Sequence, residues 1–60
     1  MIRVKYVNGE IEFFQGNNYR YLWEENMFEV VTGNHKVLLP VSNVKSIGCG
    51  MMVNGEFKYD

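Results

Sequence analysis

The chain has 60 residues, 47% of them hydrophobic, and a formal net charge of −1, which together predict one small folded domain rather than a disordered segment. The chain lacks the excess of basic residues with which proteins bind duplex DNA, so we expect no binding to duplex DNA. No apolar run approaches the ~20 residues of a membrane-spanning helix, so we expect no association with a membrane. A lone cysteine, Cys49, excludes an internal disulfide and is typical of a reducing cytoplasm. The start of the chain does not resemble a signal peptide, so we expect a cytoplasmic location.

Turn-forming residues recur at short, even intervals along the chain. These turn signals are Asn8-Gly9, Gly16-Asn17-Asn18, Glu25-Asn26, Gly33-Asn34, Ser42-Asn43 and Asn54-Gly55. Between them lie runs of about six residues rich in Val, Ile, Tyr, Phe and Trp, which favour strands. The pattern predicts an all-β fold in a single domain, residues 1–60: a small antiparallel SH3-like barrel of five to six strands over residues 1–47, then a C-terminal tail hairpin over residues 48–60.

The first hairpin is predicted around Asn8-Gly9. This pair favours a two-residue type I′ turn, and the turn fixes the pairing of the flanking strands. The resulting register places Lys5 opposite Glu12, an attractive cross-strand pair. It also gathers five apolar side chains on the face that we expect to be buried: Ile2, Val4, Tyr6, Ile11 and Phe13.

A three-stranded meander is predicted next. If Glu25-Asn26 and Gly33-Asn34 are both two-residue loops, Trp23 faces Phe28 and Val30 faces Val37. The two registers then agree on one core face, which consists of Tyr19, Tyr21, Trp23, Phe28, Val30, Val37 and Leu39.

The last third of the chain begins with a strand end at Pro40, because proline cannot donate to a strand ladder. A tight, 3₁₀-like turn and the closing barrel strand from residue 44 are expected to follow. Gly48-Cys49-Gly50 is interpreted as a flexible joint before the tail hairpin. The string Val-Asn-Gly-Glu occurs at 7–10 and again at 53–56. We interpret it as two uses of one favourable turn; the alternative is that both hairpins present similar edges for pairing between subunits.

The second face of the predicted sheet is too apolar for a monomer of this size. We predict an interface with a second copy or with another protein, formed by Phe14, Leu22, Val31, Leu38, Met51 and Met52. The alternative is a mis-assigned register.

A stripe of aromatic residues around Arg20 offers another site. Alternating aromatics are first of all a core pattern, but the stripe could also bind a small ligand such as a nucleotide in a pocket between subunits. A platform that stacks single-stranded nucleic acid is a third interpretation, although the negative net charge counts against it. The candidate ligand-binding residues are Tyr19, Arg20, Tyr21 and Trp23.

Few side chains could carry catalysis. Cys49 and His35 are the only thiol and imidazole, and nothing in their spacing supplies the orienting group or oxyanion hole that a Cys–His pair needs. Without a Cys/His cluster, zinc is not expected either. We therefore expect no catalytic residue, no metal ion and no cofactor, and a protein that binds rather than an enzyme.

Two segments, residues 4–10 (Val-Lys-Tyr-Val-Asn-Gly-Glu) and 39–47 (Leu-Pro-Val-Ser-Asn-Val-Lys-Ser-Ile), carry a family likeness. Through them the chain resembles short SH3-like β-proteins of Gram-positive bacteria and their phages. The resemblance implies an accessory or host-directed viral protein in the host cytoplasm and transfers no functional residue. Our leading expectation is a small self-associating binding module, a dimer or higher, such as a phage-encoded inhibitor or regulator of a host protein.

Overall fold

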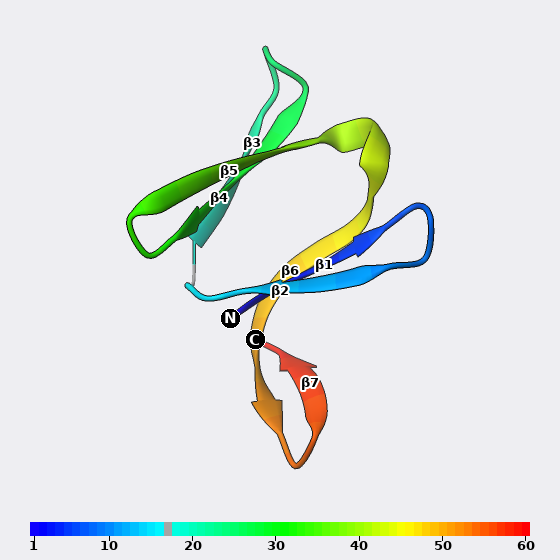
Figure 1. Cartoon of the computed structure of the whole chain (residues 1–60), viewed down its shortest axis with the longest axis vertical. Helices are drawn as coiled ribbons and strands as arrows, with labels where there is room; N and C mark the ends of the chain where they lie inside the picture. Colours follow the sequence, from blue (N-terminus) through cyan, green and yellow to red (C-terminus); the bar gives the residue numbers. More distant parts are fainter. Residues whose placement is uncertain (17) are drawn as a thin grey trace.

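The computed structural model describes residues 1–16 and 18–60 (Figure 1). Its elements in chain order are β1 (Ile2–Tyr6), β2 (Ile11–Phe14), β3 (Asn18–Leu22), β4 (Met27–Thr32), β5 (His35–Pro40), the 3₁₀ turn η1 (Val41–Asn43), β6 (Val44–Val53) and β7 (Glu56–Tyr59). They form two antiparallel sheets, in the orders β2-β1-β6-β7 and β3-β4-β5. The all-β class is confirmed, but the two sheets do not close into a barrel. Within the described ranges, no helix is long and apolar enough to cross a membrane.

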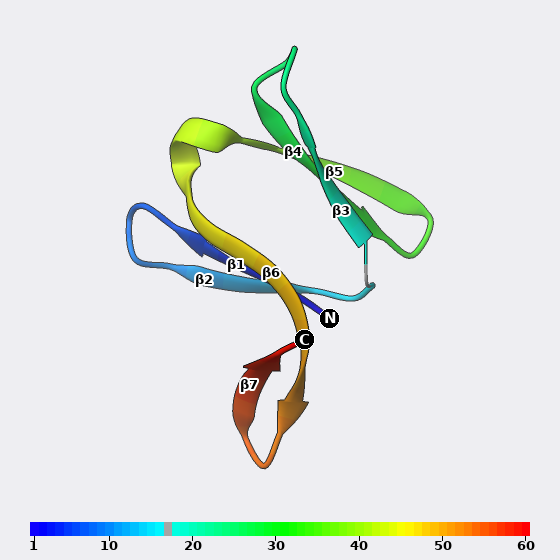
Figure 2. The ribbon, with the colours of Figure 1, turned by 180° about the vertical axis from the view of Figure 1, so that it is seen from behind.

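Strand β6 holds the larger sheet together. Its first half pairs with β1 and its second half pairs with β7. The molecule measures 38 × 27 × 17 Å, and it is elongated because the β3–β4 hairpin extends from one end and the β6–β7 hairpin from the other (Figures 1 and 2). Both hairpin tips therefore project from the body of the molecule.

The core lies between the two sheets. Its buried centre consists of Ile2 and Val4 from β1, Val30 from β4 and Leu39 from β5. Partly buried side chains surround this centre: Tyr6, Phe14, Tyr19, Phe28, Val37, Val44, Ile47 and Cys49. The four central residues were all predicted to face the core, and that part of the prediction is confirmed.

The predicted register of the first hairpin is wrong by one residue. Lys5 pairs with Ile11, not with Glu12. Tyr6 and Glu10 close a three-residue loop, in which the Tyr6 N–H donates to the Glu10 carbonyl at 2.8 Å and the Gly9 N–H donates to the Tyr6 carbonyl at 3.0 Å. Gly9 has φ 93°, as in the three-residue loops that end on a left-handed glycine.

This one-residue slip turns the whole of β2 over, because side chains alternate between the faces of a strand. Ile11 and Phe13, both predicted in the core, lie outside and are 46% and 45% exposed. Phe14, predicted on the outer face, packs against the core instead. The placement of these three residues from sequence was therefore wrong.

The string Val-Asn-Gly-Glu makes two different turns. At residues 53–56, Val53 pairs with Glu56, and both Asn54 (φ 52°) and Gly55 (φ 82°) have positive φ, which is the type I′ turn that the sequence predicts. At residues 7–10 only the glycine has positive φ. The same four residues thus fit a two-residue loop and a three-residue loop.

The meander is predicted correctly at its second turn and wrongly at its first. Thr32 pairs with His35 across Gly33-Asn34, as predicted. Leu22, however, pairs with Met27, so that residues 23–26 form a four-residue turn. The register of β3 moves by two residues, which leaves its two faces unchanged.

Trp23 is the residue most affected by this longer turn. It lies in the turn rather than in a strand and is 73% exposed, so the prediction that it belongs to the core is wrong. Tyr21, on the predicted core face, is also more than half exposed.

The segment Gly48-Cys49-Gly50 is part of a strand and not the flexible joint predicted from its glycines. The Gly50 N–H donates to the Met1 carbonyl at 2.9 Å, and the Met1 amino group donates to the Gly50 carbonyl at 3.1 Å. Gly48 and Gly50 are buried, so the tail hairpin continues the larger sheet directly. Of the predicted turn Gly16-Asn17-Asn18, Asn17 lies outside the described residues.

Candidate functional site

An aromatic cluster occupies the outer face of the four-stranded sheet. The rings of Phe13 and Phe57 have centroids 5.7 Å apart, and those of Phe57 and Tyr59 lie 4.9 Å apart in an edge-to-face arrangement. Phe13 comes from β2, whereas Phe57 and Tyr59 come from β7, so residues more than forty positions apart meet here. Edge-to-face rings attract one another beyond their burial of apolar area, which holds this cluster in place.

The cluster exists because β6 has glycines beneath it. A Cβ atom on Gly48 would lie 2.6 Å from the Tyr59 ring, and one on Gly50 would lie 2.9 Å from the Phe57 ring and 2.0 Å from the Lys58 carbonyl oxygen. The two glycines thus leave room over β6 for the aromatic rings of β7.

Arg3 and Met52 complete the surface. Arg3 Nη1 donates to the Tyr59 hydroxyl oxygen at 2.8 Å, which ties β1 to the last residue of β7. A shallow depression is lined by these residues together with residues 55–56. We call the set formed by Arg3, Phe13, Met52, Phe57 and Tyr59 the aromatic face.

The aromatic face has the composition of a protein interface. Phe13, Met52 and Tyr59 are each about half exposed, and aromatic residues, methionine and arginine are the types enriched in interface centres. In the described part of the chain, ion pairs join Arg20 to Glu29 and Lys58 to Glu56, and Arg3 has none. The face therefore presents apolar rings and one cation without a carboxylate.

The structure divides the residues predicted to form an interface between its two sheets, and the strand pairing places three of them, Leu22, Val31 and Leu38, on one face of the smaller sheet. Leu22, Val31 and Leu38 lie on the three-stranded sheet, where the first two are half-buried and Leu38 is 53% exposed. Met51 and Met52 are consecutive in β6 and point to opposite sides of the hairpin. Of the six predicted residues, Met52 alone belongs to the aromatic face.

The four predicted ligand-binding residues are also separated. Tyr19 packs against the core, and Tyr21 lies 5.6 Å from Phe28, ring centroid to ring centroid. Arg20 points to the other side of β3, where its Nε donates to a Glu29 carboxylate oxygen at 2.9 Å. Glu29 is 8% exposed, and a buried carboxylate needs such a partner. Arg20 is thus engaged with a carboxylate on the side away from the aromatic stripe.

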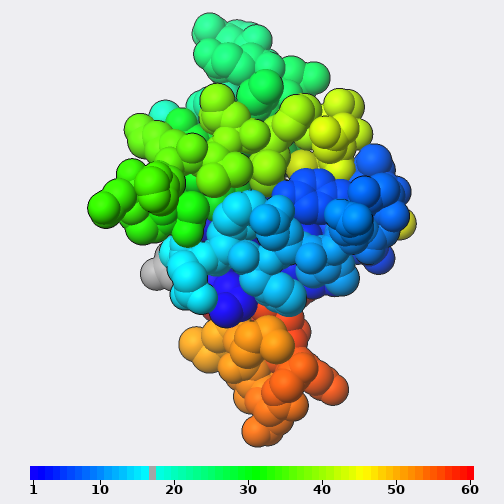
Figure 3. Space-filling model, in the orientation of Figure 1, coloured from blue at the N-terminus to red at the C-terminus, as the bar shows by residue number. Residues whose placement is uncertain are grey.

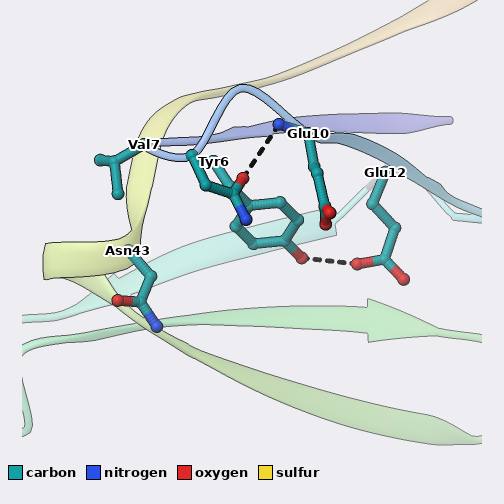
Figure 4. Close-up of a pocket in the computed structure, with 6 residues that line it drawn as sticks. Tyr6, Val7, Glu10, Glu12 and Asn43 are labelled. Atoms are coloured by element: carbon teal, nitrogen blue, oxygen red, sulfur yellow. Dashed lines mark hydrogen bonds between the residues drawn. The ribbon is translucent and has the colours of Figure 1, made fainter.

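A second depression lies beside the first hairpin and contains a tyrosine–glutamate pair (Figure 4). The Tyr6 hydroxyl donates to Glu12 Oε1 at 2.5 Å. Burial, and then this hydrogen bond and the negative charges of Glu12 and Glu10, raise the pKa of Tyr6 to about 12. The pair is a structural contact that fixes the β1–β2 hairpin, and it brings no nucleophile or cation to the depression.

The thiol and the imidazole lie on different sheets. Cys49 is in β6 opposite Ile2 and packs against the core, whereas His35 begins β5 at an exposed turn. Among the residues described, no group of three or more His, Cys, Asp or Glu side chains is placed to hold a metal ion.

Sequence reasoning missed Arg3, Phe13, Phe57 and Tyr59 as site residues. A signal for them was present. Phe57 and Tyr59 alternate in one arm of a predicted hairpin, and Gly48 and Gly50 alternate in the other arm. Glycines that lack a side chain on one face of a strand leave room for large side chains from the neighbouring strand.

Comparison with known proteins adds no relative to these observations: no protein-family model, curated protein sequence or solved structure matches the chain.

Proposed function

We propose that this chain is a protein-binding module whose contact surface is the aromatic face. One observation carries the proposal: an exposed cluster of three aromatic rings, a methionine and an arginine on one face of the four-stranded sheet. A soluble monomer gains nothing from exposing such a cluster, and contiguous apolar patches of this kind mark interaction sites.

The rings are held before any partner arrives. Phe57 and Tyr59 are fixed by the sheet, by each other and by the Arg3 hydrogen bond, so little side-chain freedom is lost on binding. Preorganised anchors of this sort bind more tightly than flexible ones of equal area. Among the residues that the structure describes, no carboxylate pairs with the Arg3 guanidinium, which favours an apolar segment of a protein with an acidic residue at its border.

The order of the elements supports an SH3-like arrangement as part of this proposal. A meander of β3, β4 and β5 is followed by η1, and β6 then returns to pair with β1. That order is also the order of elements in SH3-like barrels, and this likeness supports the proposed arrangement. An accessory or host-directed regulatory role in the cytoplasm is the biological setting that we propose for such a module.

The test compares two tyrosines of equal exposure. Tyr59 is 54% exposed on the aromatic face, and Tyr21 is 52% exposed on the other sheet. Proteins that the wild type captures should be lost with Tyr59→Ala and kept with Tyr21→Ala. Calorimetry with the purified partner should show that Tyr59→Ala weakens the affinity at least tenfold, as the loss of an interface anchor does.

A charge test accompanies it. Arg3→Gln should weaken binding and reduce its dependence on salt, whereas Lys36→Gln, a change on the three-stranded sheet, should leave both unaltered. Equal binding by the Tyr59 and Tyr21 variants would show that the aromatic face is not the contact surface.

A further inference from the structure

Strand β7 leaves one edge of the larger sheet open. Among the described strands it pairs only with β6. The Asp60 N–H donates to the Cys49 carbonyl, so every second residue before it, Lys58 and Glu56, also directs its backbone groups to β6. The N–H and C=O groups of Phe57 and Tyr59 therefore point outward, away from the sheet.

The open edge is short, at four residues, and carries one lysine, but it lacks two other features that protect sheet edges from pairing. β7 contains no proline and no bulge, and its hairpin extends beyond the body of the molecule (Figure 3). Its two charged residues, Glu56 and Lys58, have opposite sign and lie on the same side of the strand, where they form an ion pair at 3.1 Å. An edge of this type invites strand addition.

We propose that a second copy of this chain pairs along β7, antiparallel, about a two-fold axis centred on Phe57. Phe57 then exchanges both backbone hydrogen bonds with Phe57 of the other copy. Glu56 of each chain stands opposite Lys58 of the other, which makes two attractive cross-strand pairs per dimer. The edge is thus complementary to itself, as a two-fold interface requires.

Charge selects this register over its competitor. A two-fold axis inside the strand can be centred on Phe57 or on Lys58, since these are the interior residues of Glu56–Tyr59. Centred on Lys58, the strands would place the two lysines opposite one another, and like charges in that position destabilise a sheet. The sequence Glu-Phe-Lys favours only the first arrangement.

The dimer joins the two four-stranded sheets into one and brings both aromatic faces to the same side. This inference goes beyond the proposed function and does not depend on it, because the β7 edge pairs through backbone groups that the aromatic face does not use. One consequence is a partner surface of twice the length, with two binding sites held at a fixed separation.

Charge exchange between Glu56 and Lys58 tests the register. Sedimentation analysis of the wild type should give twice the 7.0 kDa of one chain. Glu56→Lys and Lys58→Glu each place like charges in both cross-strand pairs, and each should weaken the dimer about tenfold or more. The double variant should restore the dimer, and a mixture of the two single variants should form a heterodimer.

Each alternative outcome contradicts the proposal. A wild type with the mass of one chain at all concentrations would overturn the dimer, and a dimer that ignores both single variants would overturn this edge as its interface. A dimer weakened by neither exchange but broken by Phe57→Ala would place contact on the aromatic face instead. Circular dichroism controls for folding, and Lys58→Gln replaces Lys58→Glu should the latter fail to fold. Partner capture by the Tyr59 and Tyr21 variants is read separately, so the two proposals fail independently.

Discussion

The ring of Tyr59 lies over Gly48, 2.6 Å from the point that a Cβ atom on this glycine would occupy. Gly48→Ala should therefore displace the ring, break the Arg3–Tyr59 hydrogen bond and lower the free energy of unfolding by ~1–3 kcal/mol, as for other overpacked sites. Urea unfolding measures this loss. In a Tyr59→Ala background the same substitution should cost much less, because no ring has to move. An equal cost in both backgrounds would show that the contact is unimportant.

The two Val-Asn-Gly-Glu turns should respond differently to the same substitution. Asn54 has φ 52°, which glycine adopts more easily, so Asn54→Gly should leave stability unchanged or raise it. Asn8 does not have positive φ, and its Oδ1 accepts a hydrogen bond from the Glu10 N–H at 2.9 Å. Asn8→Gly removes that bond and should lower stability by about 1 kcal/mol. Thermal unfolding of both variants measures the two changes in stability. If Asn8→Gly and Asn54→Gly both lowered stability, or both raised it, the difference in turn type would be contradicted.

Trp23 should matter little for folding. Because it is 73% exposed in a turn, Trp23→Ala should change the free energy of unfolding by no more than about 0.5 kcal/mol. Ile2→Ala, at a fully buried site, should cost ~2–5 kcal/mol. In the wild type, tryptophan fluorescence should be readily quenched by a soluble quencher. If the quencher had little effect on the fluorescence and Trp23→Ala greatly lowered the free energy of unfolding, Trp23 would have to be a core residue.

The phenol of Tyr6 should lose its proton at unusually high pH. Its pKa is raised from 10.0 to about 12, by burial first and by Glu12 next. Since the folded state holds the proton more tightly than the unfolded chain, the resulting stabilisation is complete below pH 10 and is lost as the pH rises through about 12. Absorbance of the phenolate, compared with Tyr6→Phe, follows the titration. Glu12→Gln should lower the pKa only part of the way, because burial persists.

The sequence predicts the strands better than it predicts their pairing. Alternation of apolar residues located β1, β4 and β5 and the central core residues, and the turns at Gly33-Asn34 and Asn54-Gly55 form as expected. Asn8-Gly9, by contrast, satisfies two loop lengths equally well. Because the lengths differ by one residue, the choice decides which side of β2 faces the core.

Two further errors have the same origin. The apolar spacing around Glu25-Asn26 fits a two-residue loop as well as a four-residue loop, and the shorter loop wrongly predicts that Trp23 lies in a strand. Gly48 and Gly50 predict a flexible joint only because glycine is permissive in isolation. In the fold the neighbouring strand uses the space that they leave. Whether a glycine in one strand is covered by a large side chain depends on which strand lies beside it. The pattern of one strand alone therefore does not predict the aromatic face.

The two halves of strand β6 should differ in how long their backbone hydrogen bonds stay closed. Its first half pairs with β1 and contributes side chains to the core, whereas residues 51–53 are exposed and pair with β7. Local opening can therefore release the end of the strand while the rest stays closed. Amide hydrogen exchange should show a steep gradient of protection along these ten residues, and binding at β7 should flatten it by slowing exchange at the open end alone.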